Sequence, residues 1–243
     1  MAYSLLRTYL LNYRLFPRDV ARLLPLKVGR HVDTRGLKRG AIRFRDGVQP
    51  HRFMVRLGVT PWPLYSEKSM HTWLWLHAGA SLVLGDDVDI NGGTRIVVTS
   101  GATLELGDGF FVNQNSLLYC TRSIRFGQRC CLGWDCQVSD TDFHLLKDME
   151  TGIVRNPSAP VTVGDDVWLA ARVVVGKGVS IASGAVVAAG SVVCKPLAEQ
   201  GLYAGVPAVL KRRGVTRVTD KKEERRLRKA FRRHPDAGEL PSD

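Results

Sequence analysis

The segment DTDFH at residues 140–144 holds the residue types that acid–base chemistry requires. A histidine has an unperturbed pKa of about 6.5, so it is the side chain best suited to take a proton from a hydroxyl group near neutral pH. In an extended segment Asp140, Asp142 and His144 share one face, because successive side chains alternate. Either carboxylate could then orient the imidazole and stabilise its protonated form. The competing interpretation is a histidine that only caps a loop.

A period of six residues runs through the chain on both sides of this segment. Downstream, an aliphatic residue recurs at every sixth position, and the residue after each is small. The aliphatic positions are Val163, Leu169, Val175, Ile181, Val187 and Val193. The same step appears upstream, for example at Leu84, Ile90 and Ile96, and it is lost between His144 and about Val161.

Six residues match neither the period of a helix nor a long two-residue alternation, but they match a short strand followed by a corner. Three such units form a triangular coil of about eighteen residues, and coils stack at the inter-strand spacing of about 4.8 Å. The pattern therefore predicts a mainly β protein built as a parallel β-helix, with small residues where the chain bends.

The repeats also resemble a known family. The runs LELGDGFFVNQN, IRFGQRCCLGWDCQVSDTDFH, VTVGDDVWLAARVVVGKGVSIASGAVVAAGSVVCK and YAGVPAVLKRR resemble the left-handed β-helix, hexapeptide-repeat acyltransferases. Within them the chain is most similar to the sugar O-acetyltransferases, including the maltose, galactoside and capsular or exopolysaccharide enzymes. The left-handed sense is implied by this resemblance alone, because the general crossover rule favours a right-handed connection. The resemblance also implies acetyl-CoA as co-substrate, no metal, and a homotrimer with shared active sites.

The resemblance assigns roles to several residues near the middle of the chain. His144 matches the family's catalytic histidine. Asn113 and Asn115 match a motif that faces the acceptor sugar, with Asn115 the preferred contact, although asparagine is also common at corners. Trp168 matches a tryptophan beside the cleft, and a purely structural role is its alternative.

The residues implied to contact coenzyme A lie in the final coils. They are Ala171, Ala189, Cys194, Lys195, Lys211, Arg212 and Arg213. The last three could pair with the coenzyme's phosphates. This chain has Val209 where relatives often carry Lys or Arg, which leaves open how phosphate binding is shared among the three.

The formal charge of +12 is concentrated at the two ends of the chain. Residues 1–56 hold 13 Lys and Arg against 3 Asp and Glu, residues 57–210 hold 10 against 14, and residues 211–233 hold 12 against 3. A net negative central segment argues against a nucleic-acid surface on the main domain. The ends could instead make a weak peripheral contact with an anionic membrane, or only solvate the protein.

Three segments are expected. Residues 1–74 form a helical cap and lead-in strands, in which the helical stretch either covers the end of the β-helix or lies on lipid. Residues 75–212 form the β-helix, with an insertion at 145–159 that could serve as a lid or acceptor-binding wall. Residues 213–243 form a basic helix or tail.

Other classes of function are disfavoured. No stretch has the 18 or so apolar residues of a membrane span, and arginines interrupt the N-terminal apolar stretch that a signal peptide needs. Five cysteines without a CxxC pair suit a reducing cytoplasm. GKG at 176–178 lacks P-loop spacing. His71, His77 and His144 are spaced too widely for the zinc site of a γ-type carbonic anhydrase.

The sequence thus predicts an acetyl-CoA-dependent O-acetyltransferase acting on a sugar hydroxyl in polysaccharide or glycolipid precursor synthesis. The alternatives are a serine O-acetyltransferase or sugar N-acyltransferase on the same fold, and a non-catalytic β-helix that binds a partner.

Overall fold

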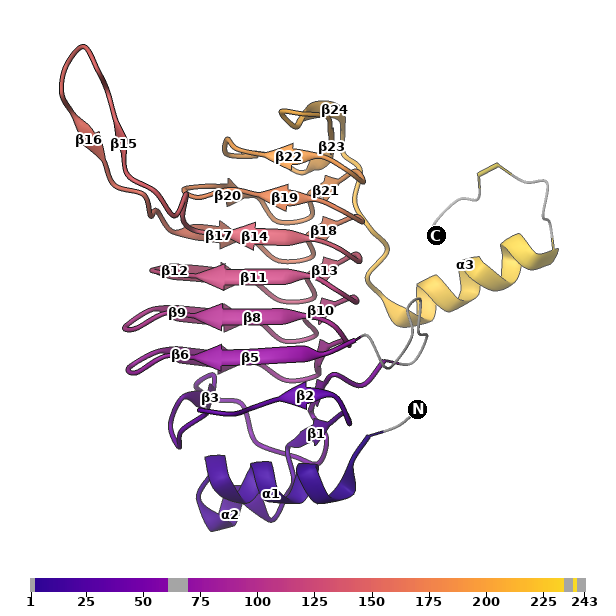
Figure 1. The fold of residues 1–243 in the computed structure, drawn as a ribbon. Coiled ribbons are helices and arrows are strands. Elements are labelled where there is room, and N and C mark those ends of the chain that lie inside the picture. The colour runs from indigo at the N-terminus through magenta and orange to yellow at the C-terminus, as the bar shows by residue number, and fades with distance from the viewer. Residues whose placement is uncertain (1–2, 61–69, 234–237, 240–243) are drawn as a thin grey trace.

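The computed structural model describes residues 3–60, 70–233 and 238–239. Three sheets of parallel strands form the three sides of a coil, and successive coils stack along one axis (Figure 1). Sheet 1 contains β1 (Leu26–Val28), β4 (Val55–Leu57), β7 (Val88–Ile90), β10 (Phe111–Val112), β13 (Cys131–Leu132), β18 (Trp168–Leu169), β21 (Val186–Val187), β23 (Gly201–Ala204) and the antiparallel β24 (Val209–Arg213).

Sheet 2 contains β2 (Val32–Asp33), β5 (Thr72–Leu76), β8 (Arg95–Val98), β11 (Leu117–Cys120), β14 (Gln137–Ser139), β19 (Val174–Val175) and β22 (Val192–Val193). Sheet 3 contains β3 (Ile42–Phe44), β6 (Ser81–Leu84), β9 (Thr103–Leu106), β12 (Ser123–Phe126), β17 (Val161–Val163) and β20 (Ser180–Ile181). We call the corner that leads from sheet 1 into sheet 2 the 1/2 edge, and the corner that leads from sheet 2 into sheet 3 the 2/3 edge.

The expected left-handed parallel β-helix is confirmed. The strands of sheet 2 face the viewer in Figure 1 and run from right to left while the chain climbs from bottom to top. A coil that advances in this way is left-handed.

The period of six places one aliphatic side chain of each strand inside the coil. Ile96, Leu118, Val138 and Val175 stack along the inner face of sheet 2, and each is at most 1% exposed. Cys130 and Cys136 are also fully buried, so they belong to this core. Stacked coils therefore share one continuous apolar interior.

The small residue after the aliphatic is required where successive coils touch, as they do at the corner of Gly107. A Cβ atom added to Gly107 would overlap the backbone of Gly127 and lie 2.9 Å from the amide nitrogen of Gln128. Real Cβ atoms do not approach backbone so closely, so this corner must be a glycine. Gly176 also follows an inner aliphatic, but it lies at the 2/3 edge, where the atom nearest to an added Cβ would be the Val193 carbonyl oxygen at 3.7 Å. This corner leaves room for a methyl group.

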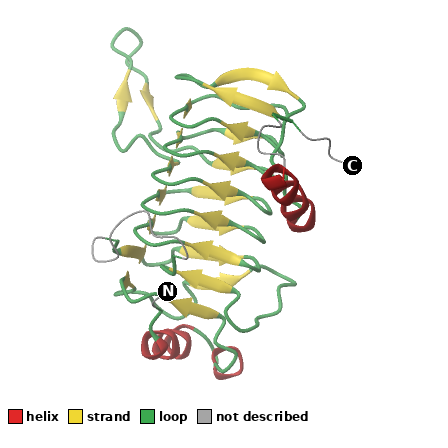
Figure 2. Cartoon of the chain, turned by 90° about the vertical axis from the view of Figure 1, so that its right-hand side faces the viewer, coloured by secondary structure: helices red, strands yellow, loops and turns green. Residues whose placement is uncertain are grey.

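Two helices close the first coil (Figures 1 and 2). Helix α1 (Leu5–Leu15) is capped by the Ser4 hydroxyl, which accepts a hydrogen bond from the Arg7 amide, and α2 (Arg18–Ala21) follows Pro17. Leu11 and Leu15 on α1 are buried against the core. The helices thus cover one open end of the apolar interior.

The β-helix begins earlier than the expected boundary at residue 75. Strands β1, β2 and β3 already pair in parallel with β4, β5 and β6, so they form its first coil. The period is hidden there because long corners separate the three strands. The correct start of the coil is therefore near Leu26, and residues 3–25 alone form the cap among the described residues.

Two segments leave the coil. The hairpin of β15 (Leu146–Lys147) and β16 (Val154–Arg155) projects as an arm between β14 and β17 (Figure 1). Helix α3 (Lys221–Arg233) projects from the sheet 1 side and has no buried residue. None of the helices described here has the length and apolar character needed to cross a bilayer.

We predict that Gly107→Ala destabilises the fold, because its methyl group would push against the next coil. Overpacking of this kind costs about 1–3 kcal/mol of unfolding free energy. The matched control Gly176→Ala should lie within about 0.5 kcal/mol of the wild type, because its corner has space. Denaturant unfolding followed by circular dichroism measures both, and equal effects would contradict the corner-contact explanation.

Candidate active site

The DTDFH segment begins at the 2/3 edge, directly after β14. Asp140 is fully buried, and its two carboxylate oxygens accept hydrogen bonds from the Thr121 amide (2.7 Å), the Thr121 hydroxyl (2.8 Å), the Arg122 amide (2.7 Å) and the Ser123 amide (2.8 Å). Buried carboxylates need such partners to offset desolvation. Asp140 therefore holds the corner of the preceding coil, and its oxygens are already occupied by groups other than His144.

The second aspartate of the segment lies at the surface. The Asp142 carboxylate forms an ion pair with Lys177 Nζ at 2.5 Å, and Lys177 also donates to the carbonyl oxygen of Asn156 at 3.0 Å. The His144 amide donates to the Asp142 carbonyl oxygen at 2.7 Å. The His144 side chain is exposed, and its ring has no hydrogen bond to any other residue described. The backbone around His144 is thus held in place, while its imidazole ring remains available to contact a substrate.

Phe143 turns the segment over the outer face of sheet 2. Its backbone adopts a φ of 64°, and its ring packs edge-on against the Tyr119 ring with centroids 4.8 Å apart. A left-handed conformation is unfavourable for a bulky residue, so local contacts must maintain it. The ring pair is one such contact, and it places His144 near the 2/3 edge of sheet 2.

The arm that follows His144 is attached firmly at its base. Thr141 and Ser158 form an antiparallel bridge, and the Ser158 hydroxyl lies 2.9 Å from the Thr121 hydroxyl that also donates to Asp140. Beyond the base, large apolar side chains of the arm are exposed, namely Leu145, Leu146, Met149, Ile153 and Val154. The arm is therefore an apolar surface that no other part of the described chain covers.

The asparagines lie at the 1/2 edge. Asn115 has a φ of 61°, and its amide donates to the Asp135 carboxylate at 2.6 Å. Asp135 also lies 3.8 Å from the Arg172 guanidinium. The Asn113 side-chain oxygen accepts a bond from the Gln114 amide at 2.9 Å, which is a local turn contact. The edge thus displays a polar column in which Asn115 faces outward.

The residues expected to contact coenzyme A occupy three places, namely the 1/2 edge, the 2/3 edge and strand β24. Ala171 and Ala189 lie on the 1/2 edge above Asn115, where the Gly190 amide donates to the Ala171 carbonyl oxygen at 2.9 Å. Cys194 and Lys195 follow β22 at the 2/3 edge and are exposed, two strands above β14.

The other candidates lie on sheet 1. Trp168 is 37% exposed on its outer face, between Cys131 and Val186. Lys211 and Arg212 are exposed on β24, whereas Arg213 is paired with Glu199 through two bonds of 2.9 Å. Of these three basic residues, Lys211 and Arg212 therefore remain available to bind phosphate.

One chain does not bring His144 and Asn115 together. Asn115 precedes β11, whereas His144 follows the neighbouring strand β14, so the two lie beyond opposite ends of sheet 2. Five residues of extended chain between these corners span about 16 Å. A site that uses both residues therefore needs a second chain or a large ligand.

The outer face of sheet 2 carries an apolar strip, beside the polar Arg95, Gln137 and Ser139, and sheet 3 has no such strip among its described residues. Trp73 and Trp75 are about half exposed, and Val97, Leu117 and Tyr119 continue the strip. The outer positions of sheet 3 hold polar side chains, among them Ser81, Thr103, Glu105, Ser123, Arg125, Thr162 and Ser180. A contiguous apolar strip of this kind marks an interaction surface.

The described residues offer neither a cysteine nucleophile in the core nor a metal centre. Burial raises the pKa of the Cys120 thiol to about 12, with the charge of Asp140 adding to the effect, and burial raises the pKa of Cys130 to about 12 and of Cys136 to about 11. These thiols are protonated at neutral pH and are poor nucleophiles. Nowhere in the described ranges do three His, Cys, Asp or Glu side chains form a group that could hold a metal ion.

Sequence reasoning missed three site residues. Lys177 lies in the GKG stretch, and its contact with Asp142 depends on the stacking of β19 above β14. Asp135 and Phe143 were likewise not singled out as partners of Asn115 and Tyr119. The twenty-residue offset between Asn115 and Asp135, which repeats the strand pairing, is the pattern from which that contact could have been found.

Comparisons with known proteins agree with the architecture. The bacterial transferase hexapeptide family (six repeats) matches residues 160–195. The chain is 27% identical over 107 residues to the galactoside O-acetyltransferase of Escherichia coli K12, which covers 44% of this chain and 52% of that protein. It is 39% identical over 80 residues to a 2,3,4,5-tetrahydropyridine-2,6-dicarboxylate N-acetyltransferase of Staphylococcus aureus, which covers 32% of this chain and 34% of that protein.

Among solved structures, a maltose O-acetyltransferase from Clostridium difficile 630 is 25% identical with a TM-score of 0.41, over 49% of this chain and 63% of that one. The chain spans only about half the length, or less, of the curated relatives it matches. The match of residues 160–195 to the hexapeptide transferase repeat nevertheless agrees with the coil of parallel strands that these residues form.

Proposed function

We propose that the protein is an acetyl-CoA-dependent O-acetyltransferase that acetylates a sugar hydroxyl by direct transfer, with His144 as general base. The observation that carries this proposal is an exposed, unpartnered imidazole on a segment whose backbone is fixed by Asp140 and by the Asp142–Lys177 ion pair. General bases work best when their position is fixed while the reacting nitrogen stays accessible.

The reaction needs no covalent enzyme intermediate. His144 takes the proton of the acceptor hydroxyl, and the resulting oxygen nucleophile attacks the carbonyl carbon of the thioester. The tetrahedral intermediate collapses with cleavage of the carbon–sulfur bond, and the imidazolium returns its proton to the leaving thiolate. Asp142 is the proposed orienting residue, because Asp140 has no free oxygen for this role.

We further propose that two copies build each site within a cyclic homotrimer. His144, Cys194 and Lys195 lie at the 2/3 edge, whereas Asn115 and the two alanines lie at the 1/2 edge. Placing the 2/3 edge of one copy beside the 1/2 edge of the next would unite them. This contact is heterologous, so it must repeat around a ring to close.

Two unpartnered apolar surfaces support this assembly. The strip of sheet 2 and the arm at residues 145–159 both flank the 2/3 edge. Burial between copies would remove both from water and place the arm beside the neighbouring 1/2 edge. The arm would then form a wall of the acceptor site, and Asn115 would contact the acceptor from the opposite side.

The acceptor class rests on the similarity to a galactoside O-acetyltransferase and on the motifs around Asn115 and Trp168. We propose a sugar in a polysaccharide or glycolipid precursor, acetylated in the cytoplasm, where the five free cysteines stay reduced. The second candidate is transfer to an amine, which the similarity to an N-acetyltransferase favours. Thioester release from acetyl-CoA, measured with matched hydroxyl and amino sugars, separates the two.

We predict that His144→Ala lowers kcat by about 10²–10⁴-fold and leaves the Kd for acetyl-CoA nearly unchanged, because only proton transfer is lost. Thioester release with the best acceptor of the panel gives kcat, and calorimetry gives Kd. His51→Ala, an exposed histidine that pairs with Asp86 at the corner before β7, is the matched control and should behave as the wild type. Near-normal turnover of His144→Ala would refute the proposed base.

We also predict that substitution of Asp140 lowers stability, whereas substitution of Asp142 lowers activity. Asp140→Asn should lose about 1–3 kcal/mol of unfolding free energy, because an amide NH₂ would face the backbone N–H groups of Arg122 and Ser123. Asp142→Asn should unfold like the wild type, since its carboxylate is exposed, but should lower kcat by about tenfold or more through loss of charge beside the imidazolium. If Asp142→Asn lowered stability and Asp140→Asn lowered only activity, the structural and orienting roles of the two aspartates would have to be exchanged.

A further inference from the structure

Helix α1 is apolar on two faces, although only one of them packs against the protein. Its inner face buries Leu11 and Leu15. Its outer face exposes Leu5 (67%), Leu6 (68%), Tyr9 (52%) and Leu10 (56%). A helix that only capped the coil would place polar residues on the water side. The outer face of α1 therefore needs a partner.

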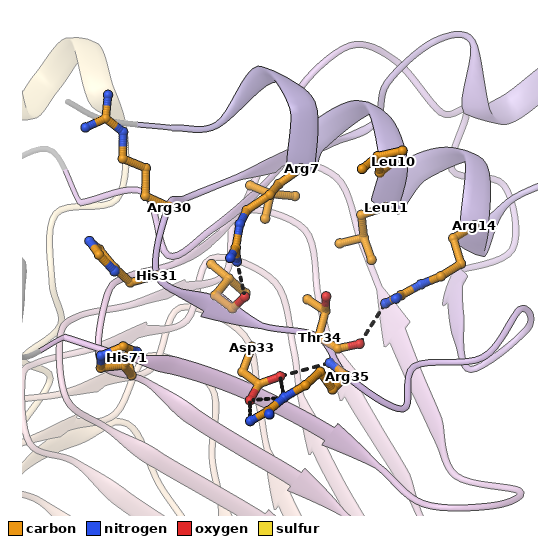
Figure 3. Close-up of a pocket in the computed structure, with 12 residues that line it drawn as sticks. Arg7, Leu10, Leu11, Arg14, Arg30, His31, Asp33, Thr34, Arg35 and His71 are labelled. Atoms are coloured by element: carbon orange, nitrogen blue, oxygen red, sulfur yellow. Dashed lines mark hydrogen bonds and ion pairs between the residues drawn. The ribbon is translucent and has the colours of Figure 1, made fainter.

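A basic groove of about 540 Å³ runs beside this face (Figure 3). Arg7 and Arg14 reach into it from α1 and donate to the carbonyl oxygens of Val32 (2.9 Å) and Thr34 (2.6 Å). Neither guanidinium forms an ion pair with a carboxylate among the described residues, although Arg7 lies near enough to Asp33 to help lower the pKa of that carboxyl. Asp33 is the acidic residue of the lining, and it is paired with Arg35 at 2.6 Å.

More positive charge surrounds the outer face. Arg18 is the first residue of α2, Arg22 is the C-cap of that helix, and Arg30 lines the groove. No bond from these three side chains to another described residue is present. The end of the coil thus combines exposed leucine and tyrosine with unneutralised guanidinium groups.

We propose that the outer face of α1 and its arginine groove dock on an anionic lipid bilayer. Leu5, Leu6 and Leu10 would enter the boundary between head groups and acyl chains, Tyr9 would lie at head-group level, and the arginines would contact lipid phosphates. A second copy of the chain is a poorer occupant, because residues 1–56 carry a net charge of +10 and two such ends would repel each other.

Helix α3 does not offer an equivalent surface despite its charge. Among the residues of α3, Phe231 is the one exposed large apolar side chain, at 39%. The helix is tied to sheet 1 by Lys221, which lies 3.3 Å from Asp87. Charge without an apolar face gives attraction to an anionic surface but no insertion. The proposal therefore assigns membrane binding to the N-terminal end alone.

The test is co-sedimentation of the full chain with vesicles of phosphatidylcholine containing about 30% phosphatidylglycerol, and with pure phosphatidylcholine, at low salt. The wild type should bind the anionic vesicles and not the neutral ones. The double variant Leu6→Gln/Leu10→Gln should lower the partition coefficient at least tenfold, with an unchanged melting temperature because both positions are exposed. The control Val206→Gln/Val209→Gln removes two exposed apolar residues at the opposite end of the coil and should bind as the wild type.

A second pair of variants tests the charge. The triple variant Arg18→Gln/Arg22→Gln/Arg30→Gln should lose about tenfold in binding, whereas Arg225→Gln/Arg232→Gln/Arg233→Gln on α3 should lose less than about threefold. Equal losses from both triple variants would show attraction by net charge alone and overturn the proposal. Absence of binding to anionic vesicles would also overturn it, as would self-association that Leu6→Gln/Leu10→Gln abolishes, which would identify α1 as a protein interface.

Discussion

Close backbone contact between successive coils is the constraint on which the rest of this structure depends. At the corner of Gly107, a single methyl group would collide with the coil above. Because the corners are this tight, each coil follows the one below at nearly constant register, and the inner aliphatics form one column. The same register brings together residues that are distant in sequence, such as Asn115 with Asp135 and Asp142 with Lys177.

The sequence was sufficient to predict the coil wherever the period of six is unbroken. From Val163 to Val193 the aliphatics at every sixth position occupy the buried inner positions. The first coil could not be seen, because β1, β2 and β3 are separated by long corners that erase the period. Left-handedness came from the family resemblance, since the physical rule for crossovers points the other way.

Prediction of the candidate site was less complete, for a physical reason. The alternation of side chains placed Asp140, Asp142 and His144 on one face, but hydrogen bonds to the neighbouring coil occupy both oxygens of Asp140. Those bonds depend on which corner stacks above which, and a single sequence does not state this. The contact of Lys177 with Asp142 could not be predicted for the same reason.

The architecture separates the proposed tasks along the axis of the coil. The apolar and basic surface of α1 lies at one end, and Lys211 and Arg212 lie on β24 at the other (Figure 1). In sheet 2 the strand before His144 is four strands above β2, which corresponds to about 20 Å. An acceptor held at a membrane surface would therefore have to extend over this distance to reach His144.

The central claim is that one copy supplies His144 and the next supplies Asn115. Co-expression of His144→Ala chains and Asn115→Ala chains with different affinity tags, followed by purification through both tags, isolates mixed trimers. Each mixed trimer would contain one intact site in three, so the account predicts about one third of wild-type turnover although each variant alone is nearly inactive. Mixed trimers no more active than the two parent variants would contradict the shared site.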